Sequence, residues 1–180
     1  MAVTSSKDFL LAFLYAPGSG GEVRQSIRGI TRFEKLVFLA LRDKHFAHLI
    51  KGFGYKPDSY GPFSDRLQDD LEGLSDIGLV QKKPLDVPEM PADELHDAEG
   101  GEFLSRPVPL VFKLTDLGVS IAGRIWDTLE PVEREAIACV KSEFNRLPLD
   151  RLLSHVYITS ASEWTSKSVV KDKYLHRVAP

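Results

Sequence analysis

The 180-residue sequence contains a single cysteine, Cys139, which excludes an internal disulfide framework and a cysteine-based zinc site. Long hydrophobic runs are also absent, because no stretch approaches the roughly 20 apolar residues that a membrane-spanning helix needs. Neither sign of charge predominates, since 23 Lys and Arg against 26 Asp and Glu give a net charge of −3. This balance gives no global attraction to phosphate, so any contact with nucleic acid must come from a local basic patch.

The remaining composition, 43% hydrophobic and 27% charged, is typical of a globular protein and fits one domain, or one domain with an appendage. The first residues lack the pattern of a signal peptide. A lone cysteine fits a reducing compartment. We therefore expect a cytoplasmic protein that does not enter a membrane.

The most informative feature is the turn Tyr60-Gly61-Pro62-Phe63-Ser64 and the run that follows it. Because proline has its φ already set for a first helical position, the pattern predicts a helix over 62–76. Four apolar residues recur three or four positions apart and define its inward face: Leu67, Leu71, Leu74 and Ile77. Gly78 then ends the helix, and 79–83 reads as a strand.

Cap residues and periodicity place the other elements. Ser5 or Ser6 caps a helix that runs to about Tyr15, and Thr31 with Glu34 forms a capping box before a strongly apolar, central helix. The later elements are a returning strand over 108–114 and helices that start at Thr115, Pro131 and Pro148.

A short helix that leads into a β-hairpin is typical of a winged-helix domain. We therefore expect a mainly α (α+β) protein with a winged helix-turn-helix, a two-stranded wing and a C-terminal helical extension. The winged-helix domain spans 5–114, the extension packed on it 115–160, and a polar, basic tail 161–180. The wing carries an acidic loop over 84–107, with seven carboxylates and no Lys or Arg between positions 86 and 102.

Three of these stretches resemble a known family: Ile30 to Leu39 (ITRFEKLVFL), Tyr60 to Ser64 (YGPFS) and Gly78 to Val80 (GLV). They resemble the YwgA-like family and, more distantly, the Panacea (SocA-like) antitoxin domain, and 144–157 is similar to that family's later helical part. The resemblance covers most of 30–160, whereas the acidic loop departs from it. It implies a bacterial or archaeal regulatory protein that neutralises a partner or adapts it to other machinery.

The predicted 62–76 helix stands where a winged helix would read DNA. Arg66 and Gln68 are its candidates for contact with base edges, and Lys82 and Lys83 are candidates for the wing. The same helix exposes several carboxylates that phosphate would repel: Asp65, Asp69, Asp70 and Glu72. The charge sum therefore opposes an approach to DNA through this face.

Basic residues gather in other segments and can hold phosphate or an acidic protein face, or can cover the core with their aliphatic stems. One cluster contains Arg42, Lys44, His45, His48, Lys51 and Lys56. A second contains Arg24, Arg28, Arg32 and Lys35. In the tail, the candidates for contact with a macromolecule are Trp164, Lys167, Lys171 and Tyr174.

Catalytic signatures are absent from the sequence. His45 and His48 could share a helix face with Asp43 and bind a metal, but no third ligand follows at a matching spacing. Cys139 occupies an apolar helix position and is expected in the core. No phosphate-binding loop or nucleophile elbow occurs. We therefore expect no catalytic residue, no metal and no cofactor, and a metal-dependent enzyme is a remote alternative.

Two hypotheses follow for function. The first is a non-enzymatic winged-helix regulator that acts by protein–protein binding, in an antitoxin-like or adaptor role. The alternative is a transcription regulator that binds double-stranded DNA, as a homodimer formed through the helices after Thr115.

Overall fold

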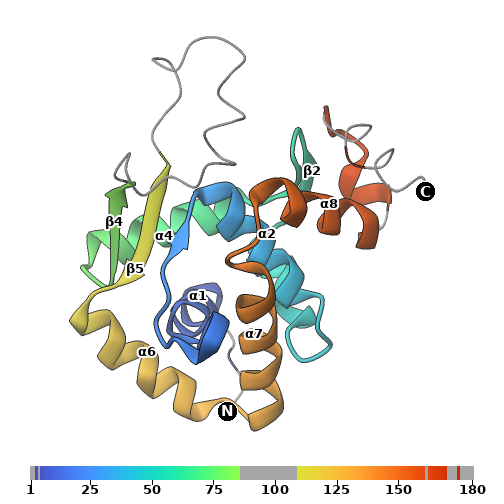
Figure 1. The fold of residues 1–180 in the computed structure, drawn as a ribbon. Helices are drawn as coiled ribbons and strands as arrows, with labels where there is room; N and C mark the ends of the chain where they lie inside the picture. The colour runs from blue at the N-terminus through green and yellow to red at the C-terminus, as the bar shows by residue number, and fades with distance from the viewer. Residues whose placement is uncertain (1–2, 4, 86–108, 161, 170–173, 175–180) are drawn as a thin grey trace.

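The computed structural model describes residues 3, 5–85, 109–160, 162–169 and 174 (Figure 1). The fold is mainly helical, with small antiparallel sheets. The helices are α1 (Ser6–Tyr15), α2 (Ile30–Leu41), α3 (Ile50–Phe53), α4 (Asp65–Asp76), α6 (Asp116–Thr128), α7 (Pro131–Phe144) and α8 (Leu149–Thr159). The strands are β1 (Ile27–Arg28), β2 (Lys56–Asp58), β3 (Gly61–Phe63), β4 (Val80–Pro84) and β5 (Leu110–Leu114), and the short 3-10 helices include η1 (Ser19–Gly21), η2 (Ala47–Leu49) and η4 (Ser162–Thr165).

Helix α1 runs through the centre of the molecule, and α6 and α7 pass on either side of it (Figure 1). Its residues from Phe9 to Leu14 are all buried, as expected for a helix that is apolar all round. The Phe9 ring lies edge-on to Phe46 at 5.1 Å, and Phe13 stacks on Phe33 of α2 at 6.2 Å. Ser5 caps the helix through the amide of Asp8, so the predicted start and end of this helix are confirmed.

Helix α2 is buried from Arg32 to Leu41, so the predicted central apolar helix is present. Its predicted capping box is wrong. The helix begins at Ile30 with Gly29 as its N-cap, at a φ of 84° that favours glycine. Thr31 therefore lies inside the helix, and Glu34 is buried where its side chain meets Gln68 of α4.

The larger sheet has the strand order β1-β5-β4, and both pairings are antiparallel. The predicted hairpin is confirmed as β4 and β5, in register from Val80 opposite Leu114 to Pro84 opposite Leu110. Pro84 is thus in a strand and not in the acidic loop, and the loop's residues 86–107 lie outside the described residues. A two-residue strand, β1, makes the sheet three-stranded instead of two-stranded, and it is too short to leave a pattern in the sequence.

A second hairpin, β2–β3, precedes α4 and corrects the expected start of that helix. Pro62 is the middle residue of β3, opposite Pro57, and is not a first helical residue. The helix begins at Asp65, because the Ser64 hydroxyl accepts a hydrogen bond from the Leu67 amide at 3.0 Å.

The helices after Thr115 pack on the earlier part of the chain and share one hydrophobic core with it. Thr115 caps α6 as predicted. Gly118 lies so close to the residue before β4 that an added Cβ would lie 1.9 Å from the Leu79 carbonyl oxygen. On α7, the buried Lys141 donates to the carbonyls of Leu14 and Ala16 at 2.7 and 2.8 Å, and so caps the C-terminal end of α1.

Four apolar side chains lie in the solvent although their spacing predicted the core: Ile77, Leu117, Val132 and Cys139. The first three stand at helix ends, where the periodic face no longer meets a neighbouring element, and Cys139 lies on the outer face of α7. Within the described part of the chain, no helix is long and apolar enough to cross a membrane.

Candidate functional site

The two longest motifs of the family resemblance meet in the fold through a buried lysine. Lys35, on α2, is 1% exposed and donates from Nζ to the carbonyl oxygen of Pro62 at 2.7 Å. The Ser64 hydroxyl donates to the carbonyl of Phe53. Gly61 has a φ of 86° and lies against Tyr157, so glycine is required there. The YGPFS turn is therefore a structural joint between α2, α3 and α8.

A buried network surrounds this joint. The Glu34 carboxylate lies 3.8 Å from Lys35 Nζ and accepts a hydrogen bond from Gln68 at 2.7 Å. The Tyr55 hydroxyl donates to the Glu34 carbonyl at 2.8 Å. Burial raises the pKa of Glu34 and lowers the pKa of Lys35 to about 8. Both shifts arise because a low-dielectric interior disfavours the charged form.

Helix α4 carries the two residues that were candidates for reading DNA, Arg66 and Gln68. Both side chains make contacts within the protein. Arg66 pairs with Asp70 through Nε at 3.2 Å. Asp70 is itself buried and also receives the Ser6 hydroxyl and Lys7, which anchors α4 to the start of α1. Gln68 is turned inward to Glu34.

Two lysines on separate strands pair with carboxylates of the same acidic helix. Lys82 on β4 forms an ion pair with Glu72 of α4, and Lys56 on β2 forms one with Asp65. Lys83 is exposed at the end of β4. The outward face of α4 presents four carboxylates and one arginine: Asp65, Asp69, Glu72, Asp76 and Arg66.

The first basic cluster follows α2 and lies beside α8. Arg42 donates to the hydroxyl and carbonyl of Thr159 at 3.0 and 2.7 Å. Lys44 and Lys51 are exposed. The two histidines have separate contacts, which are His45 Nδ1 with Asp43 at 2.7 Å and His48 Nε2 with the Val3 carbonyl at 3.1 Å. The described residues contain no group of three or more His, Cys, Asp or Glu that could hold a metal ion.

The second basic cluster does not form a surface patch, because Arg32 and Lys35 are buried. Arg32 donates from Nη1 to the carbonyls of Asn145 and Leu147, beyond the end of α7, and so caps that helix. Arg24 and Arg28 remain exposed on the segment before α2.

The part of the tail that the structure describes packs on the β2–β3 hairpin and on α2. Trp164 in η4 lies edge-on to Phe38 at 5.3 Å, and Tyr174 is buried against Tyr157 at 5.2 Å. These aromatic rings contribute to the packing of the tail, although the sequence suggested that they contact a partner. Lys167 is exposed, and Lys171 lies outside the described residues.

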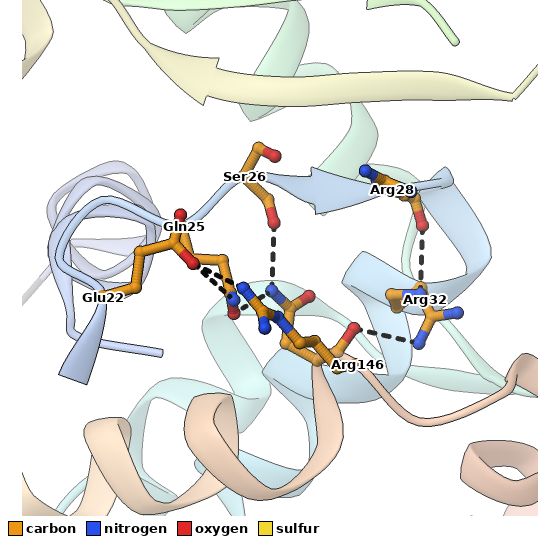
Figure 2. Close-up of a pocket in the computed structure, with 7 residues that line it drawn as sticks. Glu22, Gln25, Ser26, Arg28, Arg32 and Arg146 are labelled. Carbon is orange, nitrogen blue, oxygen red and sulfur yellow. Dashed lines mark hydrogen bonds and ion pairs between the residues drawn. The ribbon is translucent and has the colours of Figure 1, made fainter. Parts of the chain in front are cut away.

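A cavity of about 320 Å³ lies between the segment that contains β1 and the end of α7. It is lined by Glu22, Gln25, Ser26, Arg28, Arg32, Asn145 and Arg146 (Figure 2). The sequence did not predict this cavity, because the residues on its two sides are more than 100 positions apart. The only signal in the sequence was the basic cluster that contains Arg28 and Arg32.

Comparisons with known proteins add no assignment, since no protein-family model, no curated protein and no solved structure matches the chain.

Proposed function

We propose that this chain is a winged-helix regulatory protein that acts by binding another protein, in an antitoxin-like or adaptor role, without catalysis. The outward face of α4, continued by the exposed Ile77, is the surface that meets the partner.

The order of the elements supports the winged-helix part of this proposal. In a winged helix, a first helix and short strand precede two further helices, and a hairpin then forms the wing. Here α1, β1, α2, α4 and the β4–β5 hairpin follow that order, and β1 pairs with β5 as the third strand. One departure is the connection over 42–64, which carries α3 and the β2–β3 hairpin where a simple helix-turn-helix has a turn of three or four residues.

The negative charge on the exposed face of α4 is the observation that favours a protein partner over DNA. Four exposed carboxylates stand against one exposed arginine on this helix, and Arg66 already pairs with Asp70. Lys82, a candidate DNA contact on the proposed wing, pairs with Glu72 of α4. A DNA phosphate would have to displace these carboxylates and would still meet their repulsion. A protein with a basic surface meets no such penalty.

The partner's chemistry follows from the same face. Ile77 is 63% exposed directly after Asp76, so an apolar contact lies beside the carboxylates. We expect a partner that offers Lys or Arg to the carboxylates and an apolar side chain to Ile77. Complementary charge of this kind sets the association rate and its salt dependence more than the affinity.

A native pulldown from the source organism tests the proposal with matched variants. The test variant carries Asp69→Lys and Asp76→Lys on α4, and the control carries Glu135→Lys and Glu143→Lys, which makes the same change of charge at exposed positions of α7. We expect one protein to be retained by the wild type and the control and lost with the α4 variant. The proposal is wrong if no protein is enriched, or if the α4 variant retains it equally.

A DNA-binding measurement separates the alternative function. We expect no binding to the promoter of the protein's own gene at low salt, measured by fluorescence anisotropy. Salt-dependent binding that is lost with Arg66→Ala and Lys82→Ala would instead establish the transcription-regulator alternative.

A further inference from the structure

Two exposed apolar side chains stand at the junction between α4 and α6. Ile77, directly after α4, is 63% exposed, and Leu117, the second residue of α6, is 56% exposed. Hydrogen bonds hold their segments together, because the Thr115 hydroxyl donates to the Gly78 carbonyl at 2.7 Å and the Thr115 amide donates to the Leu79 carbonyl at 3.0 Å. The two apolar residues are 40 positions apart in the sequence and lie on segments in direct contact.

The packing at this junction is close. A Cβ on Gly118 would lie 1.9 Å from the Leu79 carbonyl oxygen and 3.3 Å from Leu114 Cδ2, so the first turn of α6 fits directly against the residues after α4. Thr115 also caps α6, because its hydroxyl accepts a hydrogen bond from the Gly118 amide at 3.0 Å. A surface that is fixed before binding loses less conformational entropy when a partner arrives.

Three exposed carboxylates lie on the same two segments. Asp69 and Asp76 are on the outward face of α4, and Asp116 is the first residue of α6. Within the described part of the chain, none of the three has an ion pair, whereas Asp65 and Glu72 of α4 are paired with lysines. Asp69 and Asp76 are seven residues apart, which is two helical turns or about 10.5 Å. The junction therefore combines an apolar pair with negative charge that no residue of the described chain neutralises.

We propose that Ile77 and Leu117 complete the partner surface of α4, and that a basic amphipathic helix of another protein binds there. Its apolar side chains cover the apolar pair, and its Lys or Arg residues, seven positions apart, meet Asp69 and Asp76 at the same two-turn spacing. This inference rests on the protein-binding role proposed above, and it adds α6 to the surface and a helix as the partner's binding element.

The chemistry of the junction distinguishes this occupant from two others. A nucleic-acid backbone would be repelled by the carboxylates and has no use for the apolar pair. A second copy of this chain lacks the required element, because no helix in the part of the chain that the structure describes presents two exposed Lys or Arg residues seven positions apart. A separate protein with a basic helix is the occupant that satisfies both the charge and the apolar contact.

A synthetic peptide of leucine and lysine, LKKLLKLLKKLLKL, is the probe. It forms a basic amphipathic helix and contains lysine pairs seven positions apart. A second peptide with alanine at every leucine position keeps the charge and the helix tendency but loses the large apolar side chains. Both peptides carry fluorescein, and binding is measured by fluorescence anisotropy at one pH and one ionic strength, so that general screening is the same in every sample.

The variants separate the apolar contact from the charge. Leu117→Gln removes the apolar side chain of α6 without a change of charge. Val132→Gln is the matched control, because Val132 is also the second residue of its helix, α7, and is 51% exposed. A third variant carries Asp69→Lys and Asp76→Lys. Circular dichroism checks that each variant keeps the fold of the wild type.

We expect the leucine peptide to bind the wild type saturably, with a dissociation constant of about 100 µM or less, and the alanine peptide to bind about tenfold more weakly. Leu117→Gln should weaken binding of the leucine peptide about fivefold, because apolar area is no longer buried, and Val132→Gln should leave it unchanged. The variant with Asp69→Lys and Asp76→Lys should lose binding, because the lysines of the peptide are repelled.

Three results would overturn the proposal. The first is that the leucine peptide shows no saturable binding. The second is that both peptides bind equally, or that Leu117→Gln and Val132→Gln have equal effects, since the apolar pair would then have no part in binding. The third comes from sedimentation equilibrium of the protein alone. Association that rises with concentration and is removed by Leu117→Gln, but not by Val132→Gln, would assign the surface to a second copy.

The same variants in the native pulldown separate this inference from the proposed function. If the retained protein is lost with the α4 charge variant and kept with Leu117→Gln, α4 binds a partner and the inference about the apolar pair fails. If the peptides bind as expected and the pulldown retains no protein, the surface has the stated chemistry and the proposed regulatory function fails.

Discussion

Replacement of Lys35 by methionine tests whether the buried lysine holds the YGPFS turn. Methionine keeps the length and apolar stem of the side chain, but loses the hydrogen bond to the Pro62 carbonyl at 2.7 Å and the charge 3.8 Å from Glu34. Loss of one partner from a buried ion pair costs roughly 3–5 kcal/mol. Because Gln68 still donates to Glu34, we expect the lower end, about 3 kcal/mol, in urea unfolding followed by circular dichroism.

The double variant Glu34→Gln, Lys35→Met removes both charges together. It should be more stable than Lys35→Met alone, because no uncompensated carboxylate remains in the core. The exposed Lys51→Met is the control, and its free energy of unfolding should stay within about 0.5 kcal/mol of the wild type. A loss below about 1 kcal/mol for Lys35→Met would refute the role of this lysine.

The pH dependence gives a second measurement on the same variant. The pKa of Lys35 is about 8 in the folded protein and 10.5 when the side chain is exposed, so the unfolded chain binds more protons between these values. The free energy of unfolding of the wild type should therefore rise relative to Lys35→Met across this window, by up to roughly 1.4 kcal/mol per pH unit. A difference that is constant or falls with pH would contradict the burial of a charged lysine.

Three further substitutions have direct outcomes. Gly118→Ala places a Cβ 1.9 Å from the Leu79 carbonyl oxygen, a clash with backbone that should lower the midpoint of urea unfolding strongly, by about 3 kcal/mol or more in free energy. Lys141→Met should make the rise in stability between about pH 7 and 10.5 smaller but not abolish it, because burial lowers the pKa of Lys141 to about 7 while Lys35 still contributes above pH 8. An unchanged pH profile would contradict this. Trp164→Ala should lower the free energy of unfolding by roughly 2 kcal/mol, less than for a fully buried tryptophan, because the ring packs on Phe38. It should also speed limited proteolysis after α8. Equal cleavage of the variant and the wild type would show that the ring does not hold the tail.

The local part of the fold could be predicted from short-range patterns. Ser5 and Thr115 cap the helices that they were expected to cap, and the β4–β5 hairpin lies within two residues of its predicted position. These features depend on residues a few positions apart, whose hydrogen bonds and periodicity are visible in the sequence. The same patterns failed at Pro62, because the pairing of β2 with β3 overrides the tendency of proline to begin a helix.

The charged surfaces depended less on local patterns in the sequence. The acidic character of α4 could be predicted, because its carboxylates lie within one helix. Its ion pairs with Lys82 and Lys56 could not, since these lysines come from other strands. For the cluster of Arg24, Arg28, Arg32 and Lys35, the sequence left open a binding patch and a cover for the core, and only the packed fold shows that Arg32 is buried at the end of α7.

The sequence by itself determined where the long helices lie, the caps at Ser5 and Thr115, the β4–β5 hairpin and the charge of α4, because each depends on interactions between neighbours along the chain. The tertiary structure alone decided that Lys35 holds the Pro62 carbonyl, that Lys141 caps α1, and that Asn145 and Arg146 face β1 across a cavity. Burial and hydrogen bonding between distant segments are properties of the packed chain. A charged residue in the sequence does not reveal whether it will meet solvent, a helix end or a ligand until its neighbours in space are known.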